Sequence, residues 1–192
     1  MRRWNFATLV THGEEGINVT HLPFLVSSPD GDGGALFTHL AKANPQYRDL
    51  RAGAEALVLF QGPHAFVTPG WYGNMQTFPT WNYTAVHVRG APRIFDAPEE
   101  VRALLTSLVE FHEVPLATDW KFAAMPEDLV TSRMRFIAGV EIPIRSIEGK
   151  MKLNQDKTPE DRVGVIAALE KTGDHRNAEV AALMRQLPDL AF

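Results

Sequence analysis

The stretch Ala56-Leu57-Val58-Leu59-Phe60 is an uninterrupted apolar run within a turn-rich first half of the chain. Its length is typical of a strand that is covered on both faces, and it is too short for a buried helix. Gly53 precedes the run and Gly62-Pro63 follows it, so turn-forming residues mark both ends. We therefore place residues 56–60 at the centre of a β-sheet.

Short segments rich in β-branched and aromatic residues flank this run, and turn residues separate them. The predicted strands are residues 7–12, 17–26, 35–40, 65–68, 83–88 and 93–95, with residues 27–34 as a loop. Pro23 marks a bulge or an edge position, because proline cannot donate a ladder hydrogen bond. Short strands with tight connections predict a closed or nearly closed barrel.

The second half of the chain changes to helical spacing. Asp96 and Glu99 predict a capping box, and apolar residues then recur at helical intervals as far as Glu110. The other predicted elements are helices at 44–53, 127–135, 158–171 and 176–186, and a returning strand at 138–147. The fold class is thus α+β, mainly β: a barrel with peripheral helices. We expect one domain over residues 1–192, with the main barrel strands in 1–95 and the helices and returning strand in 96–192.

The composition excludes several classes of protein. Hydrophobic residues make up 45% and charged residues 22%, which is ordinary globular usage. The absence of Cys excludes disulfides and thiolate chemistry, and the net charge of −4 gives no support for nucleic-acid binding. No apolar run is long enough to cross a membrane, and the polar start Met1-Arg2-Arg3 is unlike a signal peptide. We expect a cytoplasmic protein.

The usual catalytic motifs are absent. None of the seven histidines has metal-binding spacing, so no metal site is expected, and no Gly-x-Ser-x-Gly elbow is present. Residues 38–46 are more informative: Thr38 and His39 end a strand, Lys42 follows, and a helix begins at Asn44-Pro45. A hydroxyl, a cation and a helix N-terminus together suit a phosphate group. The alternative is an ordinary helix cap beside a solvated lysine.

Two further segments could meet a ligand. Trp71, Tyr72, Trp81 and Tyr83 lie in and beside one loop, which suggests a flat ligand or a docking subunit; the alternative is a loop packed on itself. Residues 150–155, if extended, would place Lys150, Lys152 and Asn154 on one face. This face could meet an electron-rich ring edge or a phosphate, or could be a solvated edge that prevents aggregation.

Together these segments resemble the PaiB family, the FMN-binding negative transcriptional regulators with a flavin-reductase-like split barrel. The matching stretches, in the family's order, are Ala7-Thr8-Leu9-Val10-Thr11-His12-Gly13, Thr20-His21-Leu22-Pro23, residues 39–46, Phe60-Gln61-Gly62-Pro63-His64-Ala65, Trp71-Tyr72, Pro79-Thr80-Trp81-Asn82-Tyr83, Val86-His87 and Lys152-Leu153. The Gln-Gly-Pro-His and Pro-Thr-Trp-Asn-Tyr stretches are the specific ones. The chain departs at Asp156, where a neutral amide is usual, and at Gly70, where a serine is frequent.

The resemblance implies a homodimer of FMN-binding split barrels in a bacterial cytoplasm, with the flavin at the subunit interface. It also implies a regulatory role and, if the protein is an enzyme, a flavin-dependent oxidoreductase. The residues expected at the phosphate are Thr38, His39, Lys42 and Asn44. Those expected at the ring are the backbone at Thr11, His21 and Pro23, with Trp81 and Tyr83 of the second copy. Lys152 is a further candidate. The alternatives are a flavin-free ligand-sensing dimer and a haem-binding barrel.

Overall fold

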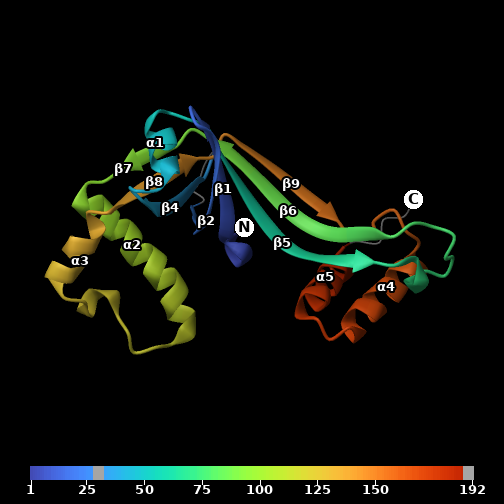
Figure 1. Ribbon diagram of the computed structural model, residues 1–192. Coiled ribbons are helices and arrows are strands. Elements are labelled where there is room, and N and C mark those ends of the chain that lie inside the picture. The colour runs from blue at the N-terminus through green and yellow to red at the C-terminus, as the bar shows by residue number, and fades with distance from the viewer. Residues whose placement is uncertain (28–32, 188–192) are drawn as a thin grey trace. The chain divides into compact units, whose positions relative to one another are not determined.

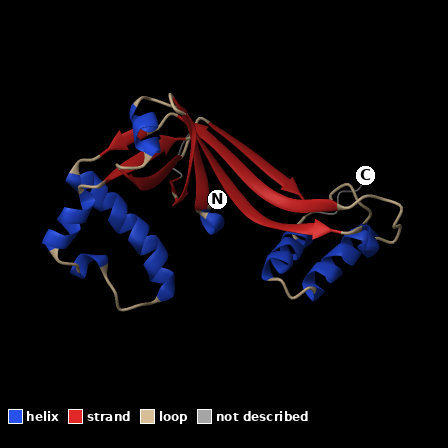
Figure 2. Cartoon of the chain, in the orientation of Figure 1, coloured by secondary structure: helices blue, strands red, loops and turns tan. Residues whose placement is uncertain are grey.

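The computed structural model describes residues 1–27 and 33–187, in which the strands form two sheets (Figure 1). The five-stranded sheet has the order β2-β1-β5-β6-β9, and the four-stranded sheet has the order β3-β4-β8-β7. The strands are β1 (Phe6–Gly13), β2 (Gly16–Pro23), β3 (Leu25–Ser27), β4 (Ala35–Ala41), β5 (Ala56–Val67), β6 (Thr80–Gly90), β7 (Arg93–Phe95), β8 (Ile137–Pro143) and β9 (Ser146–Lys152). The α-helices are α1 (Pro45–Arg51), α2 (Pro98–Glu113), α3 (Glu127–Met134), α4 (Pro159–Lys171) and α5 (His175–Arg185), and Figure 2 separates helices from strands by colour.

The apolar run 56–60 occupies the centre of its sheet, as predicted. It begins β5, which lies between β1 and β6 and continues without a break into the separately predicted strand at 65–68, ending at Val67. The predicted strand 17–26 is instead split after Pro23: β2, the edge strand of the same sheet, ends there, and β3 belongs to the other sheet, so only the edge position of Pro23 is confirmed. The predicted strand 138–147 is instead two strands, β8 and β9, which belong to different sheets.

Local capping signals position most of the helices. Asn44 caps α1 through its side chain, which accepts a hydrogen bond from the N–H of Gln46, and Thr158 caps α4 in the same way. The predicted capping box at Asp96 is wrong. Pro98 occupies the first helical position of α2, so Ala97 is the N-cap and Asp96 lies outside the helix.

The chain, predicted as one domain, divides into two compact units. Unit 1 comprises Met1–Phe60 and His87–Glu148, and unit 2 comprises Gln61–Val86 and Gly149–Phe192. In unit 1 the antiparallel β1–β2 hairpin turns at Gly13 and Gly16, and β4 and β7 flank β8 in antiparallel pairing. An apolar cluster from α2, α3 and β7 packs partly against β4, and Figure 1 shows both helices beside the four-stranded sheet.

Unit 2 has its own apolar core. Residues of α4 and α5 pack there against the outer half of β5, so that Ala65, Val67, Leu169 and Met184 are almost completely buried (Figure 1). Asn82 of β6 is also buried, and its side-chain amide donates to the sulfur of Met184. The two helices therefore cover one face of these strands and bury the side chains that point to that face.

Two predictions fall on parts of the chain outside the described residues. The loop predicted at 27–34 is described only at its ends, and Pro188, expected to stop the last helix, is not described. Among the helices of the described part, none combines the length and the apolar character needed to cross a membrane.

Candidate functional site

The start of α1 places several of the predicted ligand-binding residues close together in unit 1. Asn44 accepts from the Gln46 N–H at 2.9 Å and donates its amide to the Thr20 hydroxyl at 2.9 Å. Pro45 has no N–H and lies at the first helical position. Asn44 is therefore a structural cap that ties α1 to β2, and its side chain is already occupied.

Lys42 is the accessible cation at this corner. Its Nζ lies 3.2 Å from Asp96 Oδ2, and about one third of its side chain is exposed (32%). Because the ion pair is half open to solvent, its contribution to stability is small and an anionic ligand could compete for the ammonium group. Lys42 keeps the accessibility that a phosphate ligand requires.

Thr38 is enclosed, unlike Lys42. It is completely buried, and its hydroxyl donates a 2.7 Å hydrogen bond to the carbonyl oxygen of Pro23. This bond links β4 to the end of β2 and leaves no hydroxyl proton for a ligand. The structure therefore does not bring Thr38 and Lys42 together around one opening.

His39 follows Thr38 on β4, opposite Gly139 of β8. Its Nδ1 is buried and has no hydrogen-bond partner within the described residues. Burial lowers the pKa of His39, because desolvation disfavours the charged imidazolium. The ring is therefore neutral near pH 7 and holds an unused polar atom next to Thr38.

The residues expected beside a flavin ring have different surroundings. Thr11 is buried and donates its hydroxyl to Asp49 at 2.7 Å. His21 is exposed on the edge strand β2, where its Nδ1 lies 3.0 Å from the Thr8 hydroxyl and its ring stacks on Phe6. Of these three residues, His21 alone offers a side chain to a ligand, since Pro23 contributes its carbonyl to Thr38.

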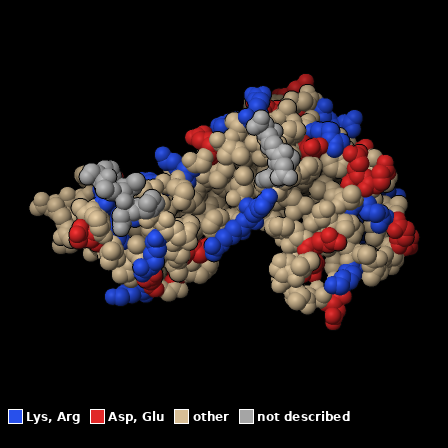
Figure 3. All heavy atoms as spheres, turned by 180° about the vertical axis from the view of Figure 1, so that it is seen from behind, with Lys and Arg blue, Asp and Glu red and all other residues tan. Residues whose placement is uncertain are grey.

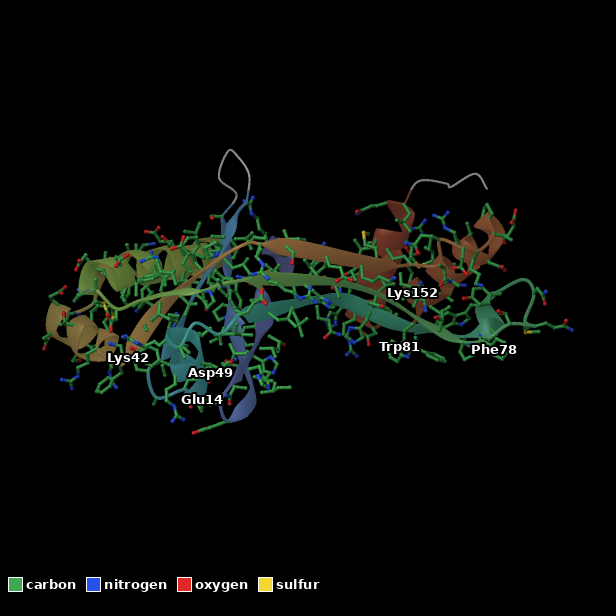
Figure 4. The ribbon with its side chains drawn as sticks, turned by 90° about the horizontal axis from the view of Figure 1, so that it is seen from above. Glu14, Lys42, Asp49, Phe78, Trp81 and Lys152 are labelled. Carbon is green, nitrogen blue, oxygen red and sulfur yellow. The ribbon has the colours of Figure 1, made fainter. Side chains whose placement is uncertain are left out.

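Of the four aromatic residues of the prediction, unit 2 exposes Trp81, whereas Tyr72 is buried in the core of the unit and Trp71 packs against that core. Trp81 is half exposed (53%), and its ring lies 5.9 Å from that of Phe66 and 6.0 Å from that of His64. Figure 4 shows Trp81 on β6, with Phe78 on the adjoining loop. Phe78 and Met75 of this loop are strongly exposed, whereas Trp71 and Tyr72 at its start pack into the core, so the alternative of a packed loop holds for that part. We call the exposed residues Phe66, Met75, Phe78 and Trp81 the aromatic surface.

Other members of the predicted set in unit 2 are placed less favourably for a ligand. Tyr83 of β6 is half-buried, and Lys152 donates to the Thr80 hydroxyl. Asn154, expected on the same face as Lys150 and Lys152, is buried with a left-handed backbone (φ 60°) and donates to the Tyr72 hydroxyl. That expectation is wrong, because β9 ends at Lys152 and the chain then turns into the core of unit 2.

Sequence reasoning missed a buried polar network behind α1. The Gln46 amide is completely buried and donates to the Leu9 carbonyl, the Thr11 hydroxyl and the Asn18 carbonyl. Asp49 accepts from Thr11 and Asn18. Much of the motif at 44–49 thus fastens α1 to the β1–β2 hairpin. The only sequence signal was three polar side chains on one short helix.

No group of three or more His, Asp or Glu residues that could hold a metal ion occurs among the described residues. In unit 1, the accessible ammonium group of Lys42 could hold a phosphate group, whereas the Thr38 hydroxyl is already occupied. Unit 2 by itself exposes aromatic rings that could contact a planar group.

Two antiparallel sheets with peripheral helices define a split-β-barrel protein. The family described as "Putative FMN-binding domain" matches residues 1–146. The chain is 32% identical over 180 residues to the protease synthase and sporulation protein PAI 2 of Bacillus subtilis, covering 94% of this chain and 86% of that protein. An uncharacterized protein of Emericella nidulans is 30% identical over 205 residues, covering 88% and 82%. The chain belongs to this PaiB-like family of FMN-binding domains, and family membership assigns FMN as its cofactor.

Solved structures confirm the fold. A FAD- and haem-binding protein of Mycobacterium smegmatis superposes with a TM-score of 0.58 at 17% identity, covering 87% of this chain and 73% of that one. A "putative 5-nitroimidazole antibiotic resistance protein" of Bacteroides thetaiotaomicron gives a TM-score of 0.55 at 15% identity, covering 77% of each chain. At these identities the likeness establishes the split-barrel fold and not a shared ligand.

Proposed function

We propose that this protein is a homodimer that binds FMN and uses it in a redox or ligand-sensing role. The observation that carries the proposal is the aromatic surface of unit 2, in a chain that belongs to an FMN-binding family. Half-exposed Phe66 and Trp81 with strongly exposed Phe78 form more apolar surface than single scattered residues would. A planar ring and a second copy of the chain are the partners that such a surface suits.

Lys42 would hold the phosphate of FMN. Its ammonium group can exchange the Asp96 carboxylate for a dianionic phosphate, which offers more charge and more acceptor oxygens. Asp96 remains nearby as a competitor and limits the affinity. Trp81 and Phe66 of the second copy would contact the ring, and His21 would donate to or accept from its polar edge. When bound, FMN supplies one- and two-electron redox chemistry that no side chain offers.

The regulatory role would depend on the ligand and not on direct DNA contact. Helix α3 begins with Glu127 and Asp128, and Arg102 of α2 is ion-paired to Glu127. On the face drawn in Figure 3, acidic and basic side chains are intermixed and form no broad basic area. A site-specific complex with duplex DNA that weakens steeply with salt would contradict this inference.

The absorption spectrum of the purified protein, before and after addition of FMN, separates the candidate functions. We expect a flavin spectrum that remains with the protein through gel filtration. A haem spectrum would favour the haem-binding alternative, and a protein that stays colourless after FMN addition would favour the flavin-free sensing dimer. Either result would overturn the proposal.

A further inference from the structure

A pocket in unit 1 lies between α2 and the four-stranded sheet. Its volume is about 730 Å³, and residues of β3, β4, β7 and α2 form most of its walls. Figure 1 shows α2 beside this sheet. Phe37, which lines the pocket, and its neighbour Thr38 point to opposite faces of β4, so the pocket lies on the face away from the Thr38 hydroxyl. None of the residues assigned above to FMN lines it.

Apolar side chains form the floor of the pocket. Phe24 is completely buried there, and Phe95 and Leu104 are almost completely buried. Phe111, near the end of α2, lines the open side and is partly exposed. Small-molecule sites in proteins are typically clefts of roughly 300–1,000 Å³ with mainly apolar and aromatic walls and a few polar groups. The volume and the lining of this pocket both agree with such a site.

Arg93 is the polar group that its neighbours hold in a fixed orientation at this pocket. Its Nε lies 2.8 Å from Glu141 Oε2, and its Nη1 lies 3.1 Å from Glu100 Oε1. Its guanidinium group also lies over the ring of Phe95, 4.7 Å from the centroid. Within the described residues, Nη2 donates no hydrogen bond, so its N–H groups are available to an acceptor on a ligand.

The charges that line the pocket are balanced. They belong to two arginines and two glutamates, Arg2, Arg93, Glu100 and Glu110. Glu141, outside the lining, is a second carboxylate paired with Arg93. An anionic ligand would have to displace one of these carboxylates from Arg93, whereas an uncharged acceptor needs only the N–H groups of Nη2. The charge distribution therefore favours an uncharged ligand.

We propose that this pocket binds an uncharged aromatic molecule that carries a carbonyl group. The aromatic body would contact Phe24 and Phe95, and burial of its apolar surface would provide most of the affinity. The carbonyl oxygen would accept a hydrogen bond from Arg93 Nη2. This site does not depend on FMN binding.

The test is a fluorescence titration of the full-length protein with prodan, an uncharged naphthyl ketone whose emission shifts to the blue in apolar surroundings. We expect a blue-shifted emission that saturates at one prodan per chain. An emission that does not shift, or that rises without saturation, would overturn the proposal.

Two matched variants locate the bound probe. Ser107 lines the pocket on α2, whereas Ser132 lies on α3 outside it, and each hydroxyl bonds to a carbonyl of its own helix. Ser107→Trp places an indole ring in the pocket, and we expect prodan to bind at least about ten-fold more weakly. Ser132→Trp should change its affinity less than about two-fold. Equal effects of the two substitutions would place the probe elsewhere and overturn the site.

Arg93→Lys tests the contact with the carbonyl group. This substitution keeps the positive charge but removes the guanidinium fork and its Nη2 donors. We expect prodan to bind about three- to ten-fold more weakly, the scale of one hydrogen bond. Dimethylaminonaphthalene, the same ring system without the ketone, should bind the variant and the wild type equally. Equal losses for both compounds would overturn the carbonyl contact.

Discussion

The Nζ of Lys42 lies 3.2 Å from Oδ2 of Asp96, a residue 54 positions further along the chain. About half of the Asp96 side chain is exposed (47%), so water screens the pair. Among the described residues, Lys42 is the accessible cation that we assign to the phosphate. Any anionic ligand that binds Lys42 must compete with Asp96.

Removing the competitor should strengthen FMN binding. Asp96→Asn keeps the shape of the side chain but releases Lys42, and we expect FMN to bind about two- to five-fold more tightly, the scale of an exposed ion pair. Riboflavin, which lacks the phosphate, should bind this variant and the wild type equally. Flavin fluorescence titrations measure both ligands. Weaker FMN binding in the variant would show that Asp96 positions Lys42 and does not compete for it.

Removing the cation should have the opposite effect. Lys42→Ala should weaken FMN binding by about 1.5–3 kcal/mol, the usual contribution of a hydrogen bond to a charged group, and leave riboflavin unchanged. The two flavins and two proteins form a thermodynamic cycle that isolates the lysine–phosphate interaction. Equal losses for both flavins would move the phosphate site away from Lys42, with Lys150 and Lys152 as the next candidates.

The buried network of α1 should contribute to the stability of unit 1. Gln46→Ala removes a buried amide whose two N–H groups serve three acceptors, the Leu9 carbonyl, the Thr11 hydroxyl and the Asn18 carbonyl. We expect a loss of about 2–4 kcal/mol in the free energy of unfolding, measured by urea denaturation. Gln76→Ala, at an exposed position, is the control and should cost less than about 0.5 kcal/mol. A cost for Gln46→Ala near that of the control would show that the network contributes little.

His39 should make the protein sensitive to mild acid. Burial lowers its pKa from the ordinary value of 6.5, so below about pH 6.5 the unfolded chain binds a proton there that the folded chain does not. Stability should therefore fall as the pH drops below 6.5, by up to about 1.4 kcal/mol per pH unit from this residue. His39→Phe should flatten that part of the profile, whereas His175→Ala, at an exposed position, should not. Parallel profiles for wild type and His39→Phe would contradict the prediction.

The aromatic surface should hold the dimer together. We expect sedimentation to show a dimer at micromolar concentration, and Phe66→Ser combined with Trp81→Ser to raise its dissociation constant at least about ten-fold. Val114→Ser changes a strongly exposed apolar residue of unit 1 and is the matched control, expected to leave the dimer unchanged. A wild-type protein that sediments only as a monomer would exclude both the dimer and a ligand site shared between copies.

Several elements could be predicted because their signals are local. The run 56–60, the cap at Asn44-Pro45 and the cap at Thr158 each depend on neighbouring residues, and the structure confirms all three. The break between β8 and β9 could not be predicted. It depends on backbone hydrogen bonds from Ile144 to Gly34 and from Arg145 to Arg89, which are distant in sequence.

The candidate site likewise contains residues that the sequence could identify and contacts that it could not. Sequence alone could identify Thr38 and Lys42 as a hydroxyl and an ammonium group near a helix start, but alternation along a strand does not say which face becomes covered. The Pro23 carbonyl that takes the Thr38 proton and the Asp96 carboxylate that meets Lys42 both come from distant segments. The role of Asp49 was missed for the same reason, since its partners lie on β1 and β2.

The most direct test of FMN binding is an equilibrium titration of the wild-type protein with FMN and, in parallel, with riboflavin. We predict saturable binding of one FMN per chain, with riboflavin at least about ten-fold weaker because it cannot meet the ammonium group of Lys42. Absence of saturable FMN binding would contradict the proposed function, and equal affinities for the two flavins would contradict the phosphate site.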